Sequence, residues 1–121
     1  MGAYSPQQFA LIRYNANGSL DESFGSGGIA LAYSGGALAM RLQTDGKAIM
    51  TGYTGDNFPR KVLARFLSNG QEDTSFGSNG RVISGALIEA GSCLAIQPDG
   101  KIIMGTQEPY GTGSYFERYL P

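Results

Sequence analysis

Short apolar segments alternate with glycine-rich polar turns along the chain, and this pattern predicts strands rather than helices. In segment 37–43, Leu38, Met40 and Leu42 alternate with Ala39 and Arg41. In segment 8–14 both faces are largely apolar, which predicts a strand covered on both sides. The pair Gly35-Gly36 predicts a break between two strands. We expect strands at about residues 8–14, 28–33, 37–43, 47–53, 61–67, 81–84, 93–97, 101–106 and 114–120.

The turns between these strands repeat. Residues 17–28 read NGSLDESFGSGG and residues 69–80 read NGQEDTSFGSNG, so eight of the twelve positions are identical at a spacing of 52 residues. The arginines before these turns, Arg13 and Arg65, recur once more as Arg118, and Asp-Gly hairpins occur at 45–46 and 99–100. We therefore divide the chain into a lead-in, 1–8, and a single repeat domain, 9–121. The domain holds one repeat at about 9–61, a second at about 62–114 and the start of a third at 115–121.

Four short strands in a repeat of ~40–55 residues are typical of a β-propeller blade. The predicted fold class is all-β, with about two four-stranded antiparallel blades per chain. The strands that start at Ala37 and Cys93 carry small apolar residues, so we expect them to be innermost in their blades.

The repeated motif resembles the delta-60 repeat. It reads Arg-Tyr/Phe, two residues, Asn-Gly, two residues, Asp, one residue, Ser-Phe-Gly, and later Gln-Pro/Thr-Asp-Gly-Lys, and it covers about Phe9 to Leu120. The resemblance implies a β-propeller-like array of the kind common in bacterial proteins and also seen in some phage proteins. It implies no particular activity. Members of that family usually carry many repeats in tandem, whereas this chain has about two.

Two blades cannot close a propeller, because each blade buries its apolar faces against its neighbours and a ring needs roughly four to eight blades. We therefore expect a homo-oligomer, in which a trimer would supply six blades and a tetramer eight. A fragment of a longer repeat array is the alternative. In such a ring one of the two equivalent strands at 8–14 and 115–119 is surplus and could pair at a subunit edge.

Composition excludes several classes of function. The net charge is −1 and charged residues make up 16% of the chain, which argues against nucleic acid or an anionic membrane as partner. No apolar run approaches the ~18 residues of a membrane span, and no signal peptide is visible. These features leave the localisation open, with an extracellular or virion-associated place compatible.

The residues that enzymes use are also missing from the pattern. The chain has no histidine and one cysteine, Cys93, which lies in an apolar segment and is expected in the core. The glutamates are scattered, and no nucleotide-binding glycine motif opens a helix. Four turn aspartates lack the spacing of a calcium loop: Asp21, Asp45, Asp73 and Asp99. We expect no enzyme activity, no cofactor and no metal.

The repeated residues are predicted to have structural roles. Asp21 and Asp73 each lie eight residues after an arginine, which predicts the ion pairs Arg13–Asp21 and Arg65–Asp73. Phe24 and Phe76 are expected to pack between blades, and Arg118 begins the same motif a third time. Lys47 and Lys101 are expected to be exposed residues at the starts of strands.

The residues that do not repeat are the candidates for binding, because the scaffold does not explain them. They lie mainly in the loops 53–60 and 107–115, where aromatic and polar side chains are mixed. The candidate ligand-binding residues are Tyr53, Asp56, Asn57, Phe58, Arg60, Glu108, Tyr110 and Tyr115. The predicted function is a non-enzymatic binding or structural module that assembles into a ring and presents these loops to a protein partner. The alternative is a multivalent lectin with aromatic sites at loop tips or between blades, although the chain has no tryptophan to stack on sugars.

Overall fold

The computed structural model describes residues 8–85, 90–107 and 113–121. These residues form strands and turns and no helix. The strands are β1 (Gln8–Ile12), β2 (Ile29–Leu42), β3 (Ala48–Thr54), β4 (Lys61–Phe66), β5 (Arg81–Ile83), β6 (Ala90–Ile96), β7 (Ile102–Gln107) and β8 (Ser114–Tyr119). Every pairing between them is antiparallel, and neighbours in each sheet are neighbours in the chain. Almost all of the lead-in lies outside the described residues.

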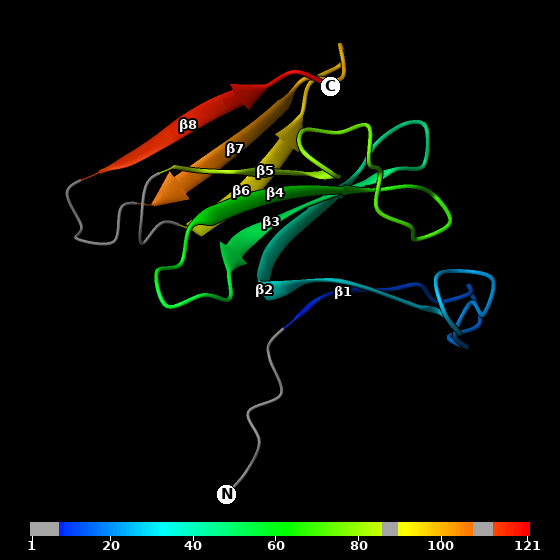
Figure 1. The fold of residues 1–121 in the computed structure, drawn as a ribbon. Helices are drawn as coiled ribbons and strands as arrows, with labels where there is room; N and C mark the ends of the chain where they lie inside the picture. Colours follow the sequence, from blue (N-terminus) through cyan, green and yellow to red (C-terminus); the bar gives the residue numbers. More distant parts are fainter. Residues whose placement is uncertain (1–7, 86–89, 108–112) are drawn as a thin grey trace, which may run out of the picture.

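The strands group into three units, stacked one above another in Figure 1. The N-terminal unit is β1 with residues 29–34 of β2. The central unit is residues 35–42 of β2 with β3, β4 and β5. The C-terminal unit is β6, β7 and β8. In terms of a four-stranded blade, the chain supplies the last two strands, then a whole blade, then the first three strands.

The prediction of separate strands at 28–33 and 37–43 is wrong, because β2 runs through both. Gly35 and Gly36 pair with Thr54 and Tyr53 of β3, so the ladder continues across the glycines. A Cβ on Gly35, whose φ is +150°, would overlap the carbonyl oxygen of Tyr53. The glycines therefore let β2 pass close to β3 as it crosses from one unit to the next.

Two apolar clusters hold the three units together. The first lies between the N-terminal and central units and contains Phe9, Ala48, Met50, Val62, Ala64 and Phe66. The second lies between the central and C-terminal units and contains Ile49, Leu63, Phe76, Leu94, Ile102 and Met104. Successive residues of a strand point to opposite faces, so β3 and β4 contribute to both clusters. Strands β3 and β4 are thus covered on both sides, and all six residues of β4 are buried, whereas Met40 of β2 is exposed.

The two outer units are covered on one side only, which corrects two predictions. The strand at 8–14 ends at Ile12 and is not covered on both faces, since Phe9 is buried but Ile12 is exposed. Cys93 is exposed and is not a core residue. Its neighbour Leu94 faces the central unit and is buried, which turns Cys93 toward the opposite, open face.

Two glycines of the repeated turn should differ in how much stability the protein loses when each is replaced by alanine. Gly25 and Gly27 both have positive φ, +56° and +61°. A Cβ on Gly25 would overlap the carbonyl oxygen of Ile29, whereas a Cβ on Gly27 would meet nothing within 4 Å. The equivalent of Gly27 in the second turn is Asn79, with φ +51°. We expect Gly27→Ala to lower the free energy of unfolding in urea by about 1 kcal/mol and Gly25→Ala by about 3 kcal/mol.

Equal losses in the two variants would contradict this assignment. Gly27→Asn is the matched control, because asparagine already occupies the equivalent position and tolerates positive φ.

Candidate functional site

The repeated motif builds a joint between a strand and the turn that follows it. In the central joint, Arg65 Nε donates a hydrogen bond of 2.8 Å to Asp73 Oδ2. The guanidinium carbon of Arg65 lies 4.6 Å from the ring centroid of Phe76. The hydroxyl and the amide of Ser75 donate to the other oxygen of Asp73, at 2.5 and 3.1 Å. The aspartate therefore has both oxygens occupied by residues of its own turn and strand.

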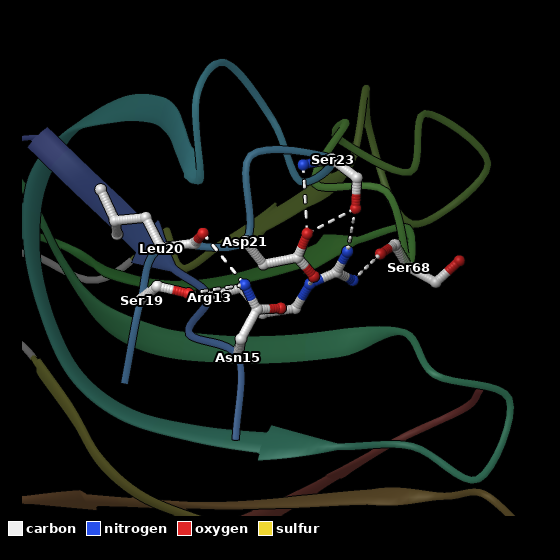
Figure 2. A network of polar contacts seen from close by, with 7 residues as sticks. All are labelled: Arg13, Asn15, Ser19, Leu20, Asp21, Ser23 and Ser68. Carbon is white, nitrogen blue, oxygen red and sulfur yellow. Dashed lines mark hydrogen bonds and ion pairs between the residues drawn. The ribbon is translucent and has the colours of Figure 1, made fainter. Parts of the chain in front are cut away.

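The N-terminal joint has the same geometry (Figure 2). Arg13 Nε donates to Asp21 Oδ2 at 2.7 Å, and its guanidinium carbon lies 4.6 Å from the centroid of Phe24. Arg13 also donates to the Ser23 hydroxyl at 3.2 Å and, from Nη1, to the carbonyl oxygen of Ser68 at 2.8 Å. Ser68 belongs to the central unit, so this joint ties the first two units together.

Lys47 completes the central joint, which corrects its prediction as an exposed residue at the start of a strand. Its Nζ lies 3.2 Å from Asp73 Oδ2 and 3.7 Å from Asp45 Oδ2. The hairpin before β3 brings Lys47 to the turn of its own unit, where the side chain is part-buried. A signal for this role is present in the sequence, because the lysine recurs as Lys101.

These contacts determine the protonation of the turn aspartates. The pKa of Asp73 is lowered to about 2, chiefly by the Ser75 hydroxyl, with help from Lys47, the Ser75 amide and the charge of Arg65, and against the effect of burial. The pKa of Asp21 is lowered as well, chiefly by the Ser23 hydroxyl. Both carboxylates are ionised at neutral pH, so neither is suited to donate a proton as a general acid.

Further polar contacts join the units at residues that do not repeat. Arg81 donates to both oxygens of Glu72, at 2.7 and 3.0 Å, and its guanidinium carbon lies 4.3 Å from the ring centroid of Tyr33. Lys61 Nζ lies 2.6 Å from Glu117 Oε2 of β8. No signal in the sequence predicts these contacts, because the first repeat has no charged pair equivalent to Glu72 and Arg81 and the other contacts join different units.

The loop after β3 is braced from inside. Thr54 Oγ1 donates to Asp56 Oδ1 at 3.0 Å and accepts from the amide of Arg60 at 2.9 Å. Arg60 and Asp56 form an ion pair of 3.2 Å. Asp56 and Arg60 are therefore occupied in closing the loop. Asn57 and Phe58 stand at its exposed tip, with Phe58 61% accessible.

The structure does not gather the other candidate residues at this tip. Tyr53 is part-buried in β3, where it pairs with Lys61. The Tyr115 hydroxyl accepts a hydrogen bond of 2.7 Å from Lys61 Nζ, at the boundary between the central and C-terminal units. Glu108 and Tyr110 lie outside the described residues. Arg118 lies on β8, and no aspartate forms an ion pair with it in the described part of the chain.

The cavities near the joints offer little acid–base chemistry. One of about 910 Å³ lies between residues 25–32 and 67–74. Its ionisable lining residue, Glu72, is already paired with Arg81. Another of about 300 Å³ is mainly apolar and lies beside Leu11, Met40 and Leu42. Among residues 8–85, 90–107 and 113–121, no three Cys, Asp or Glu side chains lie close enough together to hold a metal ion.

The described strands and turns include no helix that is long and apolar enough to cross a membrane.

Comparison with known proteins supports the fold. The family model of a domain of unknown function (DUF5122), described as a β-propeller, matches residues 2–24 and 43–76, a little under half of the chain. No curated protein and no solved structure gave a significant match. The matched segments include both Arg–Asp–Phe joints and the hairpin with Lys47. The chain is thus an all-β protein made of β-propeller blades and is similar to a propeller-like repeat family.

The low pKa of Asp73 predicts a loss of stability in acid. Its folded-state pKa of about 2 lies below the ordinary value of 3.8, so between pH 4 and pH 2 the unfolded chain binds the proton more readily. Ionised Asp73 therefore stabilises the fold above pH 4, and this contribution is lost as the pH falls through 2. We expect a loss of about 1–2 kcal/mol, after an allowance for solvent screening.

Urea unfolding at pH 4 and at pH 2 measures this loss. Asp73→Asn should be less stable than the wild type at pH 7 and should depend less on pH in the acid window. If the free energy of unfolding fell equally with pH in both proteins, the role given to Asp73 would be contradicted.

Proposed function

We propose that this chain, a repeat protein of the delta-60 kind, is a non-enzymatic binding or structural module. Copies of it assemble into a closed ring of blades and present their unrepeated loops to a protein partner. Support comes from apolar surface that the described chain leaves open on β2 of the central unit and on the outer face of the C-terminal unit.

That open surface is clearest at positions that the repeat makes equivalent. Met40 and Leu94 are equivalent residues of the innermost strands in the central and C-terminal units. Leu94 is covered by the central unit and is 4% exposed, whereas Met40 is 42% exposed. On the other side of the stack, Leu63 of β4 is fully buried and its equivalent in β8, Phe116, is 73% exposed. The same positions are thus core residues where a neighbouring unit is present and surface residues where it is absent.

The two open faces differ, and this difference favours a ring. One lies on the side of the central unit that faces the N-terminal unit, and the other lies on the far side of the C-terminal unit. Contacts between unlike faces are heterologous, and such contacts either close into a ring or continue as a filament. Each copy brings about two blades, so three or four copies fall within the usual range for a propeller.

The loop tip at Asn57 and Phe58 supports a binding role. An exposed aromatic ring beside a polar amide is a common element of protein interfaces, and a ring of copies would present this tip several times. Multiple presentation raises avidity without any new contact. A carbohydrate is the second candidate ligand, favoured by the accessible ring of Phe58 next to the amide of Asn57.

Light scattering on the purified chain tests the assembly. We expect the mass of a trimer or a tetramer, because burial of the two open faces stabilises the contact between copies by the hydrophobic effect. A well-folded monomer at micromolar concentration would contradict the proposal, and so would masses that grow continuously with concentration.

A glycan array separates the two kinds of ligand. Since the proposal favours a protein partner, we expect no binding to any sugar on the array. Sugar-specific binding by the wild type that disappears in Phe58→Ala would instead establish the lectin. Phe58→Tyr is the matched control, because it keeps an aromatic ring at the loop tip and should retain any sugar binding that depends on that ring.

A further inference from the structure

Charged groups at the two ends of the unit stack lack the partners that the central joint has. In the central unit, Asp73 pairs with both Arg65 and Lys47. Asp21 is its equivalent in the N-terminal unit and pairs with Arg13, but no lysine approaches it within the described residues. Lys101 is the equivalent of Lys47 in the C-terminal unit, and its described ion-pair partner is Asp99 of its own hairpin. The N-terminal joint thus lacks a lysine, and the C-terminal unit has that lysine without a joint.

The apolar positions are complementary in the same way. Ala39 of β2 packs against the cluster that contains Leu94, and β2 lies against β6. The repeat makes Cys93 the equivalent of Ala39 and Met40 the equivalent of Leu94. Cys93 and Met40 are both exposed, Cys93 on the outer face of the C-terminal unit and Met40 on the side of the central unit that faces the N-terminal unit. A contact like the internal one would therefore place the Cys93 of one copy against the Met40 of the next.

The space for this contact is already formed. The cavity of about 300 Å³ lies between β1 and the exposed side of Met40 and Leu42. In a whole blade, the first two strands of the N-terminal unit would occupy this region, and the described chain places no strand there. The hairpin β6–β7 consists of two such strands. It lies beyond the central unit in the same chain, so a second copy has to supply it.

We infer that the β6–β7 hairpin of one copy docks beside Met40 and Leu42 of the next copy, where Lys101 pairs with Asp21 and Cys93 lies against Met40. This inference rests on the self-assembly proposed above and specifies its contact. The C-terminal unit of one copy and the N-terminal unit of the next then form a composite blade. That blade needs only one of the equivalent strands β1 and β8, so the other leaves its place in the sheet.

The single native cysteine gives a direct test. A tagged variant carrying Met40→Cys and Cys93→Ala is mixed with the wild type while both are unfolded, and the two are refolded together and oxidised. We expect a covalent heterodimer in non-reducing gels, because Cys93 of the wild type meets the cysteine introduced at position 40 of the variant. Each protein alone should remain uncrosslinked. The matched control replaces Met40→Cys by Leu31→Cys, at another exposed position of β2, and should form no heterodimer.

The absence of the heterodimer would overturn the inference, as would equally strong disulfide dimers of the wild type alone, which would indicate a contact between like faces. Lys101→Glu gives a second measurement. We expect this substitution to lower the association constant of the assembly, measured by light scattering, at least tenfold. Lys101→Arg, which keeps the positive charge, should assemble like the wild type. An assembly that persists in Lys101→Glu and does not crosslink would refute this contact while leaving self-assembly in place. A monomeric wild type would refute both.

Discussion

The structure depends on one requirement, which is that a twisted sheet with two apolar faces must be covered on both of them. Strands β3 and β4 of the central unit meet it, since Met50 and Val62 pack on one neighbour while Ile49 and Leu63 pack on the other. Fully burying a side chain of this size stabilises a fold by about 1.5–3 kcal/mol, so the two clusters outweigh any polar contact in the molecule. The outer units meet the same requirement on one side only. The exposure of Cys93 and Phe116 follows from that difference, and Met40 is exposed because the N-terminal unit has no described strand opposite this part of β2.

The joints orient the units and add less to stability than the clusters. The ion pair of the motif also contributes differently to stability in the N-terminal joint and in the central joint. The side chains of Arg13 and Asp21 are partly exposed, and ion pairs of that kind contribute little to stability because water and salt screen them. The side chains of Arg65 and Asp73 are buried, so loss of one partner would leave the other charged and desolvated, at a cost of about 3–5 kcal/mol. The two rings do not cause the difference, because Phe24 and Phe76 are both 4% exposed. The hairpin before β3 brings Lys47 to Asp73, and the described residues include no equivalent hairpin at Asp21.

Local features of this protein can be read from its sequence, whereas features that depend on neighbouring units cannot. The duplicated turn shows the repeat, the alternation of apolar residues locates most strands, and the Asp-Gly pairs mark the hairpins. The continuity of β2 is hidden because Gly35 and Gly36 look like a break until their pairing with β3 is known. The exposure of Cys93 is hidden because an apolar segment does not reveal which of its residues faces a neighbour. The recurrence of Lys47 as Lys101 marks this lysine as part of the repeat, but its partner Asp73 lies in a different turn and is visible only in the coordinates. The candidate residues of the loops can be found in the sequence because they do not repeat, but the ion pair between Asp56 and Arg60 is visible only in the coordinates.

Repetition also has a consequence for how this fold and its assembly are linked. If copies meet through positions equivalent to those that join units within the chain, the same chemistry specifies both contacts. Substitutions at the central joint would then lower the stability of the single chain, because Arg65 and Asp73 are buried within it. Substitutions at the ends act differently, because Met40 and Cys93 are exposed and the described ion-pair partner of Lys101 lies in its own hairpin. Exposed residues of β2 and of the C-terminal unit can therefore contribute to assembly without contributing to folding, and this separation makes the contact between copies accessible to experiment.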